Sequence, residues 1–137
     1  MMWFIFAILA LFSYTVWGVM NGVVAKNMDP YTGVFFSGIG YLLSGIIALF
    51  MVKFKVQVTS ANLVSGVVLG IATGIGGLLV LLAIRYGVNV NIIVALTSVY
   101  PLLALLINYV LFGTTVNTIQ LIGVGLAIPA VIMMSSG

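Results

Sequence analysis

The chain has 137 residues, of which 64% are hydrophobic and only five are charged, four Lys or Arg and one Asp. A soluble domain carries about a quarter charged residues, so this composition excludes an ordinary soluble protein. The charges leave uncharged runs of 25, 23, 29 and 52 residues, separated by Lys26, Asp29, Lys53, Lys55 and Arg85. About 20 apolar residues of helix cross the hydrocarbon core of a bilayer. Each run is therefore long enough for one crossing, and the last for two.

The same composition excludes most kinds of enzyme site. The chain has no His, no Cys and one acidic residue. It cannot assemble a zinc site, a Cys or Ser–His nucleophile, or a pair of catalytic carboxylates. We therefore expect no enzymatic activity, no catalytic residue, no metal and no cofactor. The net charge of +3 comes from so few residues that it indicates membrane topology and no nucleic-acid partner.

The first two predicted helices are separated by a short polar turn. The first covers residues 3–24 and the second residues 31–52. Asp29 followed by Pro30 is a helix start signal, because Asp caps the free N–H groups of the next turn and Pro fits its first position.

Three further helices are predicted at residues 63–84, 90–112 and 119–133. Gly87 is a plausible left-handed terminator before the fourth helix, and residues 113–118 have the turn chemistry that separates the fifth. Candidate caps for the third helix are Ser60, Ala61 and Asn62. The chain thus forms a single all-α transmembrane domain over residues 1–137, without a soluble domain, linker or internal repeat.

Small residues mark the helix faces that are expected to pack in lipid, where close backbone approach replaces the hydrophobic effect. The second helix has such a stripe at Gly33, Ser37, Gly40 and Ser44, and the fifth at Gly123, Ala127 and Ala130. The clearest stripe is on the third helix, where Thr73 lies among Gly66, Gly70, Gly74 and Gly77. Plain helix packing explains all three stripes, and the alternative is that a glycine face lines a cavity.

The first helix carries an aromatic and amide face formed by Tyr14, Trp17, Gly18 and Asn21. Trp17 lies beyond the midplane of the predicted span, so it fits either a cavity or an interfacial aromatic belt. Asn21 favours the cavity, because a buried amide in a membrane needs a partner or water.

The fourth helix repeats this pattern with Thr97, Tyr100, Pro101, Ala104 and Asn108 on one face. Pro101 removes a backbone donor and crowds the carbonyl of Thr97, which predicts a kink near the midplane. Interrupted helices at that depth are typical of transporter binding sites. Alternatively, Pro101 only shapes the packing and Asn108 bonds a neighbouring helix.

The positions of the charges limit the coupling mechanism. All four cations are predicted at helix ends, where they can reach headgroups. No acidic residue lies inside a predicted helix, so a buried carboxylate that exchanges protons for substrate is missing. This favours passive facilitation, or coupling to something other than a buried Asp or Glu.

Several short segments resemble the EamA-type domain of the drug/metabolite transporter superfamily. Trp17-Gly18 followed by Lys26 is similar to its opening. The second half is similar to its end, with Ala83-Ile84-Arg85-Tyr86-Gly87, Leu96-Thr97-Ser98-Val99-Tyr100-Pro101-Leu102, Phe112-Gly113 and Gln120-Leu121-Ile122-Gly123 in this order. Together these segments extend over nearly the whole chain.

This resemblance implies a five-helix half-unit, of which full-length relatives contain two in inverted orientation around a central cavity. Helices one, three and four would line that cavity. The substrate-binding residues carried over are Tyr14, Trp17, Asn21, Thr73, Thr97, Tyr100 and Asn108. The related four-helix multidrug transporters use a Glu in helix one that has no counterpart here, which argues against cation-drug antiport.

A single half-unit is expected to associate, because alone it cannot enclose a cavity with two alternating mouths. With five crossings, two antiparallel copies reproduce an inverted repeat and two parallel copies do not. The Lys53–Lys55 loop lies on one side of the membrane, and Lys26 and Arg85 on the other. With two cations on each side, the positive-inside rule predicts insertion in both orientations.

The predicted function is transport of a small polar or amphipathic metabolite, for example an amino acid, by an antiparallel dual-topology homodimer in the cell inner (cytoplasmic) membrane. A related half-unit is the alternative partner. The alternative function is a membrane scaffold or subunit that transports nothing and binds a partner through its glycine faces.

Overall fold

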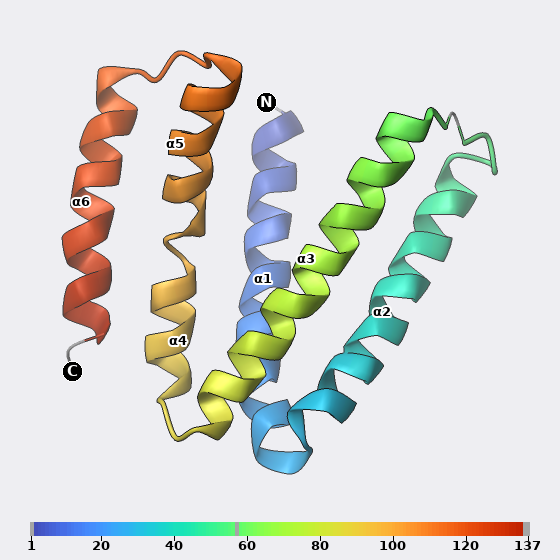
Figure 1. Cartoon of the computed structure of the whole chain (residues 1–137), viewed down its shortest axis with the longest axis horizontal. Coiled ribbons are helices and arrows are strands. Elements are labelled where there is room, and N and C mark those ends of the chain that lie inside the picture. Colours follow the sequence, from blue (N-terminus) through green and yellow to red (C-terminus); the bar gives the residue numbers. More distant parts are fainter. Residues whose placement is uncertain (1, 57, 136–137) are drawn as a thin grey trace. The chain divides into compact units, whose positions relative to one another are not determined.

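The computed structural model describes residues 2–56 and 58–135, and its regular elements there are all helices (Figure 1). Four apolar segments are long enough to cross a membrane: α1, α2, α3 and the segment Val90–Phe112, which contains α4 and α5. The remaining helix, α6, is apolar but shorter. These segments have the lengths and composition of a multi-pass membrane protein. The bounds are α1 Met2–Asn27, α2 Pro30–Met51, α3 Ser60–Arg85, α4 Val90–Thr97, α5 Tyr100–Phe112 and α6 Thr118–Ser135.

The chain divides into two compact units, Met1–Gly87 and Val88–Gly137. In the first unit, α3 packs against both α1 and α2. The helices come close together at Gly33 of α2, where an added Cβ would lie 2.6 Å from Val24 Cγ1 and 3.0 Å from Leu81 Cδ1. Gly33 therefore lets three helices approach closely near one end of this unit.

Asp29 caps α2 as the sequence predicts. Its Oδ1 accepts hydrogen bonds from the backbone N–H of Tyr31 at 3.0 Å and of Thr32 at 3.1 Å, with Pro30 in the first turn. The hydroxyl and the N–H of Thr32, followed by the N–H of Tyr31, lower the pKa of the Asp29 carboxyl below its ordinary value. The carboxylate form is therefore favoured where the cap needs an acceptor.

The C-terminus of α2 ends in a Schellman motif without glycine. The Phe54 N–H donates to Leu49 O at 3.1 Å and the Lys53 N–H to Phe50 O at 3.0 Å. Lys53 and Phe54 have positive φ angles of 53° and 59°. The rings of Phe50 and Phe54 lie edge to face at 5.0 Å, which provides the apolar contact of this motif.

The ends of α3 test two expectations about local sequence. The predicted caps Ser60, Ala61 and Asn62 are wrong, because α3 already begins at Ser60 and Thr59 takes the N-cap position without a side-chain hydrogen bond. Gly87, with a φ of 91°, has the predicted left-handed conformation just after the helix.

The cations of the first unit lie near helix ends. Lys26 and Arg85 are in the last turns of α1 and α3, at the same end as the connection between α1 and α2 (Figure 1). Lys53 and Lys55 lie in the connection between α2 and α3, at the opposite end. Each end of the unit therefore carries two cations.

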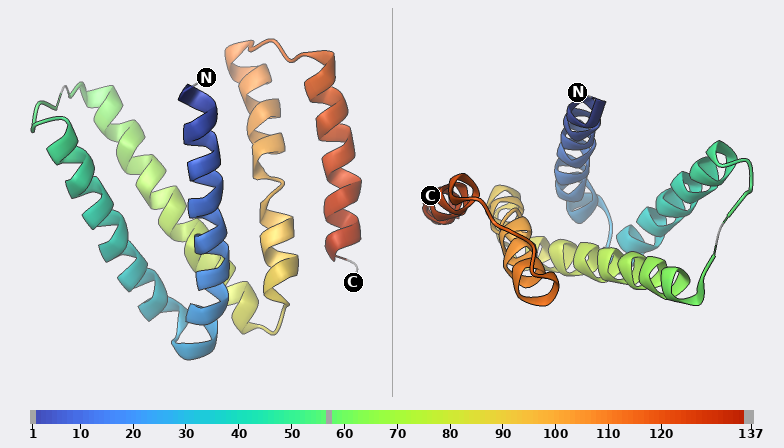
Figure 2. Two further views of the ribbon diagram at one scale, coloured as in Figure 1. Left: turned by 180° about the vertical axis from the view of Figure 1, so that it is seen from behind. Right: turned by 90° about the horizontal axis from the view of Figure 1, so that it is seen from above.

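In the second unit, α6 packs against α4. The segment 90–112, predicted as one kinked helix, is two helices separated by Ser98 and Val99, and this break is visible in Figure 1 and in the left view of Figure 2. Gly113, with a φ of 60°, ends α5 in the left-handed conformation.

Candidate functional site

The break between α4 and α5 leaves backbone groups without their helical partners. Pro101 has no N–H to give the carbonyl of Thr97, and the Leu102 N–H donates to Val99 O at 2.9 Å instead of to Ser98 O. Ser98 Oγ donates to Ala95 O at 2.6 Å, which supports the turn. Two carbonyl oxygens, those of Thr97 and Ser98, therefore lack their usual donors about a third of the way along an apolar span.

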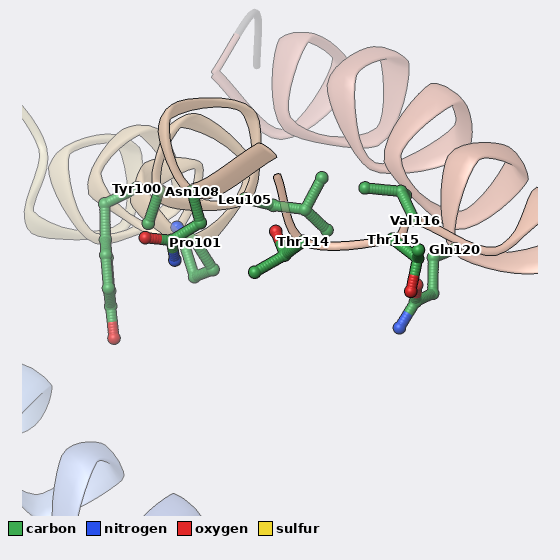
Figure 3. Close-up of a pocket in the computed structure, with 9 residues that line it drawn as sticks. Tyr100, Pro101, Leu105, Asn108, Thr114, Thr115, Val116 and Gln120 are labelled. Atoms are coloured by element: carbon green, nitrogen blue, oxygen red, sulfur yellow. The ribbon is translucent and has the colours of Figure 1, made fainter. Parts of the chain in front are cut away.

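A shallow pocket of about 440 Å³ begins just after this break. It follows one side of α5 and continues along the connection to the first turn of α6 (Figure 3). At 1.5 Å per residue, the 12 steps from Tyr100 to Phe112 cover about 18 Å, so the pocket extends from the middle of the span toward its end. Its lining residues are Tyr100, Pro101, Ala104, Leu105, Asn108, Thr114, Thr115, Val116 and Gln120.

Gln120 is held beside the pocket by a reciprocal cap at the start of α6. The Asn117 N–H donates to Gln120 Oε1 at 2.9 Å, and the Ile119 N–H to Asn117 Oδ1 at 3.3 Å. The bond to Gln120, at the third helical position, is that of a capping box, whereas the Asn117 side chain caps the N–H of the second position instead of the third. It uses the carbonyl oxygen of Gln120 and leaves the NH₂ group for other partners.

The structure brings two of the predicted site residues, Tyr100 and Asn108, together in this pocket. Both project from α5 on the side where Thr114 and Gln120 also lie (Figure 3). Thr97 is not among the lining residues. Its hydroxyl donates to Ile93 O at 2.9 Å and to Val94 O at 3.1 Å, so it is satisfied within α4.

The other four predicted residues belong to the first unit, in α1 and α3. Tyr14 and Trp17 are exposed, at 66% and 44% of their full accessible surface. Asn21 is 8% exposed, but its Nδ2 donates to Trp17 O at 2.8 Å. Thr73 likewise donates to Leu69 O at 2.8 Å. The side-chain donors of Asn21 and Thr73 are thus satisfied one turn earlier in their own helices.

The glycine face of α3 is open within the chain. An added Cβ at any of its four glycines would meet no atom within 4 Å: Gly66, Gly70, Gly74 and Gly77. Helix packing on this face remains a prediction, because nothing in the first unit covers it.

Thr114, Thr115 and Gln120 were not predicted as site residues. Two signals in the sequence could have indicated them. One is the pair of threonines directly after Gly113, and the other is the Asn117-x-x-Gln120 spacing of a capping box. Their proximity to Asn108 depends on the path of the connection between α5 and α6.

Comparison with known proteins identifies one family. The model of the EamA-like transporter family matches residues 1–136, which confirms the resemblance of the short segments. No curated protein and no solved structure matches the chain significantly. The family consists of membrane transporters rather than enzymes. With its apolar helices and this match over nearly its whole length, the chain belongs to the EamA-like transporter family and is a multi-pass membrane protein of the drug/metabolite transporter class.

Proposed function

We propose that the protein moves a small polar or amphipathic metabolite across the inner membrane by alternating access, with amino acids among the candidate substrates. The break between α4 and α5 is the observation that carries this proposal. Irregular backbone at membrane depth is tolerated only where it is buried in protein or lines a cavity. Transporters commonly place substrate at such interrupted helices.

The proposed site combines the broken span with the polar faces of α1 and α3. Tyr100 and Asn108 line the pocket beside the break. We assign Thr97 and the α1 and α3 residues to the same cavity in the working assembly. These are Tyr14, Trp17, Asn21 and Thr73.

The proposed assembly is an antiparallel homodimer. Each end of the first unit carries two cations, and residues 86–137 carry no charge, so the positive-inside rule gives no preferred orientation. The open glycine face of α3 offers a surface for close approach of a second copy. A related half-unit could occupy the same surface.

Flux through proteoliposomes tests the transport function. Trp17→Ala and Asn108→Ala should each reduce uptake of a transported metabolite at least tenfold without dissociating the dimer. Ser44→Ala is the control, because the Ser44 hydroxyl donates to Gly40 O at 3.0 Å and lies outside the proposed site. Unchanged uptake by both test variants would contradict the proposed site.

The second candidate is a membrane scaffold, favoured by the open glycine face of α3. It predicts that the purified protein shows no flux for any metabolite class and that a second polypeptide copurifies through this face. Gly70→Leu would then abolish copurification.

A further inference from the structure

The pocket beside α5 contains an amide that behaves differently from the other Ser, Thr and Asn side chains inside the helices. Beyond the first turn of each helix, the Ser, Thr and Asn side chains that the structure describes donate to a carbonyl oxygen one turn back, with one exception. The exception is Asn108, on the pocket wall. Asn21, the other amide deep within a span, satisfies itself on Trp17 O, so the same bond is sterically available to a helical Asn.

The polar residues that line the pocket with Asn108 also have hydrogen-bonding groups without a partner. In the described part of the chain, the hydroxyls of Tyr100, Thr114 and Thr115 make no hydrogen bond, and Gln120 uses only its carbonyl oxygen. Asn108 lies inside the apolar span, where an unsatisfied amide is costly, so its side chain calls for a hydrogen-bonding partner beyond its own helix. The polar groups of the pocket include both donors and acceptors.

The pocket lies in a part of the chain without formal charge. All five charged side chains precede residue 86, and residues 86–137 contain none. Transfer of an ion into an apolar environment without a counter-charge has a desolvation cost that hydrogen bonds from neutral groups do not offset. The walls therefore disfavour both anions and cations.

The size of the pocket and its apolar wall narrow the class of solute further. A volume of about 440 Å³ falls within the range of small-molecule sites. Pro101, Leu105 and Val116 supply apolar wall between the polar groups. A compact molecule with one apolar part and one amide or hydroxyl part matches this lining.

We propose that this pocket binds an uncharged amphipathic solute through a carboxamide or hydroxyl group, with Asn108 and Thr114 as its principal hydrogen-bonding partners. The proposal rests on the transport function and narrows its substrate class. It predicts that neutral molecules bind in this pocket more tightly than amino-acid zwitterions.

Three ring compounds that differ in their polar group test the proposal: benzamide, benzoate and benzamidinium. Binding is measured by ligand-observed NMR on the purified full chain in nanodiscs. Benzamide should bind at least tenfold more tightly than either charged analogue. Asn108→Leu and Thr114→Val should each weaken benzamide binding by about tenfold, the loss of one good hydrogen bond.

Asn27→Leu is the matched control. It makes the same substitution at an amide that already donates to Val23 O at 2.8 Å, and it should leave benzamide binding unchanged. Circular dichroism checks that each variant retains its helices.

Three results of the binding measurements would overturn the neutral-solute proposal. They are equal or tighter binding of a charged analogue, no saturable binding of benzamide in the millimolar range, and unchanged benzamide binding in both Asn108→Leu and Thr114→Val. If Asn108→Leu instead dissociates the dimer while benzamide binding persists, Asn108 pairs with another helix and the proposal also fails. Proteoliposome flux separates this failure from that of the transport function, because flux of charged metabolites can continue when neutral binding is absent.

Discussion

At the residue scale, the least expected feature is a lysine in a position that usually holds glycine. Lys53 has a φ of 53° in the Schellman motif that ends α2. The left-handed conformation costs a side-chain-bearing residue roughly 1–2 kcal/mol, because Cβ approaches the following carbonyl oxygen. The charge of Lys53 is one of the two cations at this end of the first unit.

Lys53→Gly should therefore stabilise the protein by roughly 0.5–1 kcal/mol, after the larger entropy of glycine in the unfolded chain is subtracted. Thermal unfolding in detergent measures the change. Lys55→Gly is the control, because it removes the same charge at a residue without a positive φ. If Lys55→Gly stabilises as much as Lys53→Gly, charge and not backbone strain is the cause.

The sequence predicts local features of single residues better than the partners of their side chains. The Asp29 cap follows from two adjacent residues, so it could be predicted. Asn21 and Asn108 are both amides inside apolar helices, yet one bonds its own helix and the other faces a pocket. Whether the amide bonds its own helix depends on its rotamer and on the path of the loop after α5. Neither can be predicted from helical periodicity.

At the element scale, one glycine determines how α2 meets its neighbours. An added Cβ at Gly33 would lie closer to Val24 than real Cβ atoms approach and in tight contact with Leu81, whereas at Gly40 it would meet nothing within 4 Å. The sequence placed both glycines in one stripe. Only their tertiary surroundings distinguish them.

Gly33→Ala should destabilise the protein by about 1–3 kcal/mol, the usual cost of overpacking a tight contact. Gly40→Ala, in the same helix, should be neutral or stabilising by up to about 1 kcal/mol, because alanine is the better helix former. Denaturation in mixed micelles compares the two variants. Equal effects would show that the contact at Gly33 adapts at no cost.

The break between α4 and α5 shows why a kink could be predicted but its extent could not. Pro129 lies inside α6 without interrupting that helix, whereas Pro101 follows a two-residue turn. Both prolines remove one backbone donor. The difference lies before Pro101, where the Ser98 hydroxyl stabilises the turn through Ala95 O.

Pro101→Ala should join α4 and α5 into one helix, because it restores the N–H that Thr97 O lacks. Removing an interior proline should stabilise the helix by up to about 3 kcal/mol and reduce flux at the same time. The chain has no cysteine, so spin labels at Ile92 and Val110 can be introduced without background. A continuous helix separates their Cα atoms by about 27 Å.

Pro129→Ala is the control for this measurement and should leave the distance between the labels unchanged. An identical distance distribution in Pro101→Ala and the parent protein would show that the proline does not cause the break.

At the scale of the whole molecule, the balance of cations is the feature that links sequence, fold and proposed assembly. Lys26 and Arg85 lie at one end of the first unit, and Lys53 and Lys55 at the other. The helix ends place the charges as the sequence predicts. The sequence does not predict how two copies would associate, because that depends on surfaces such as the glycine face of α3, which is open within the first unit.

The position of the C-terminus in living cells tests the proposed antiparallel pair most directly. Reporters that are active only in the cytoplasm, or only outside it, are fused after Gly137. The parent chain should give both signals. The double variant Lys53→Gly/Lys55→Gly should give the cytoplasmic signal alone, because all remaining cations then lie on the C-terminal side. A signal from one side only in the parent chain would contradict dual topology and with it the antiparallel homodimer.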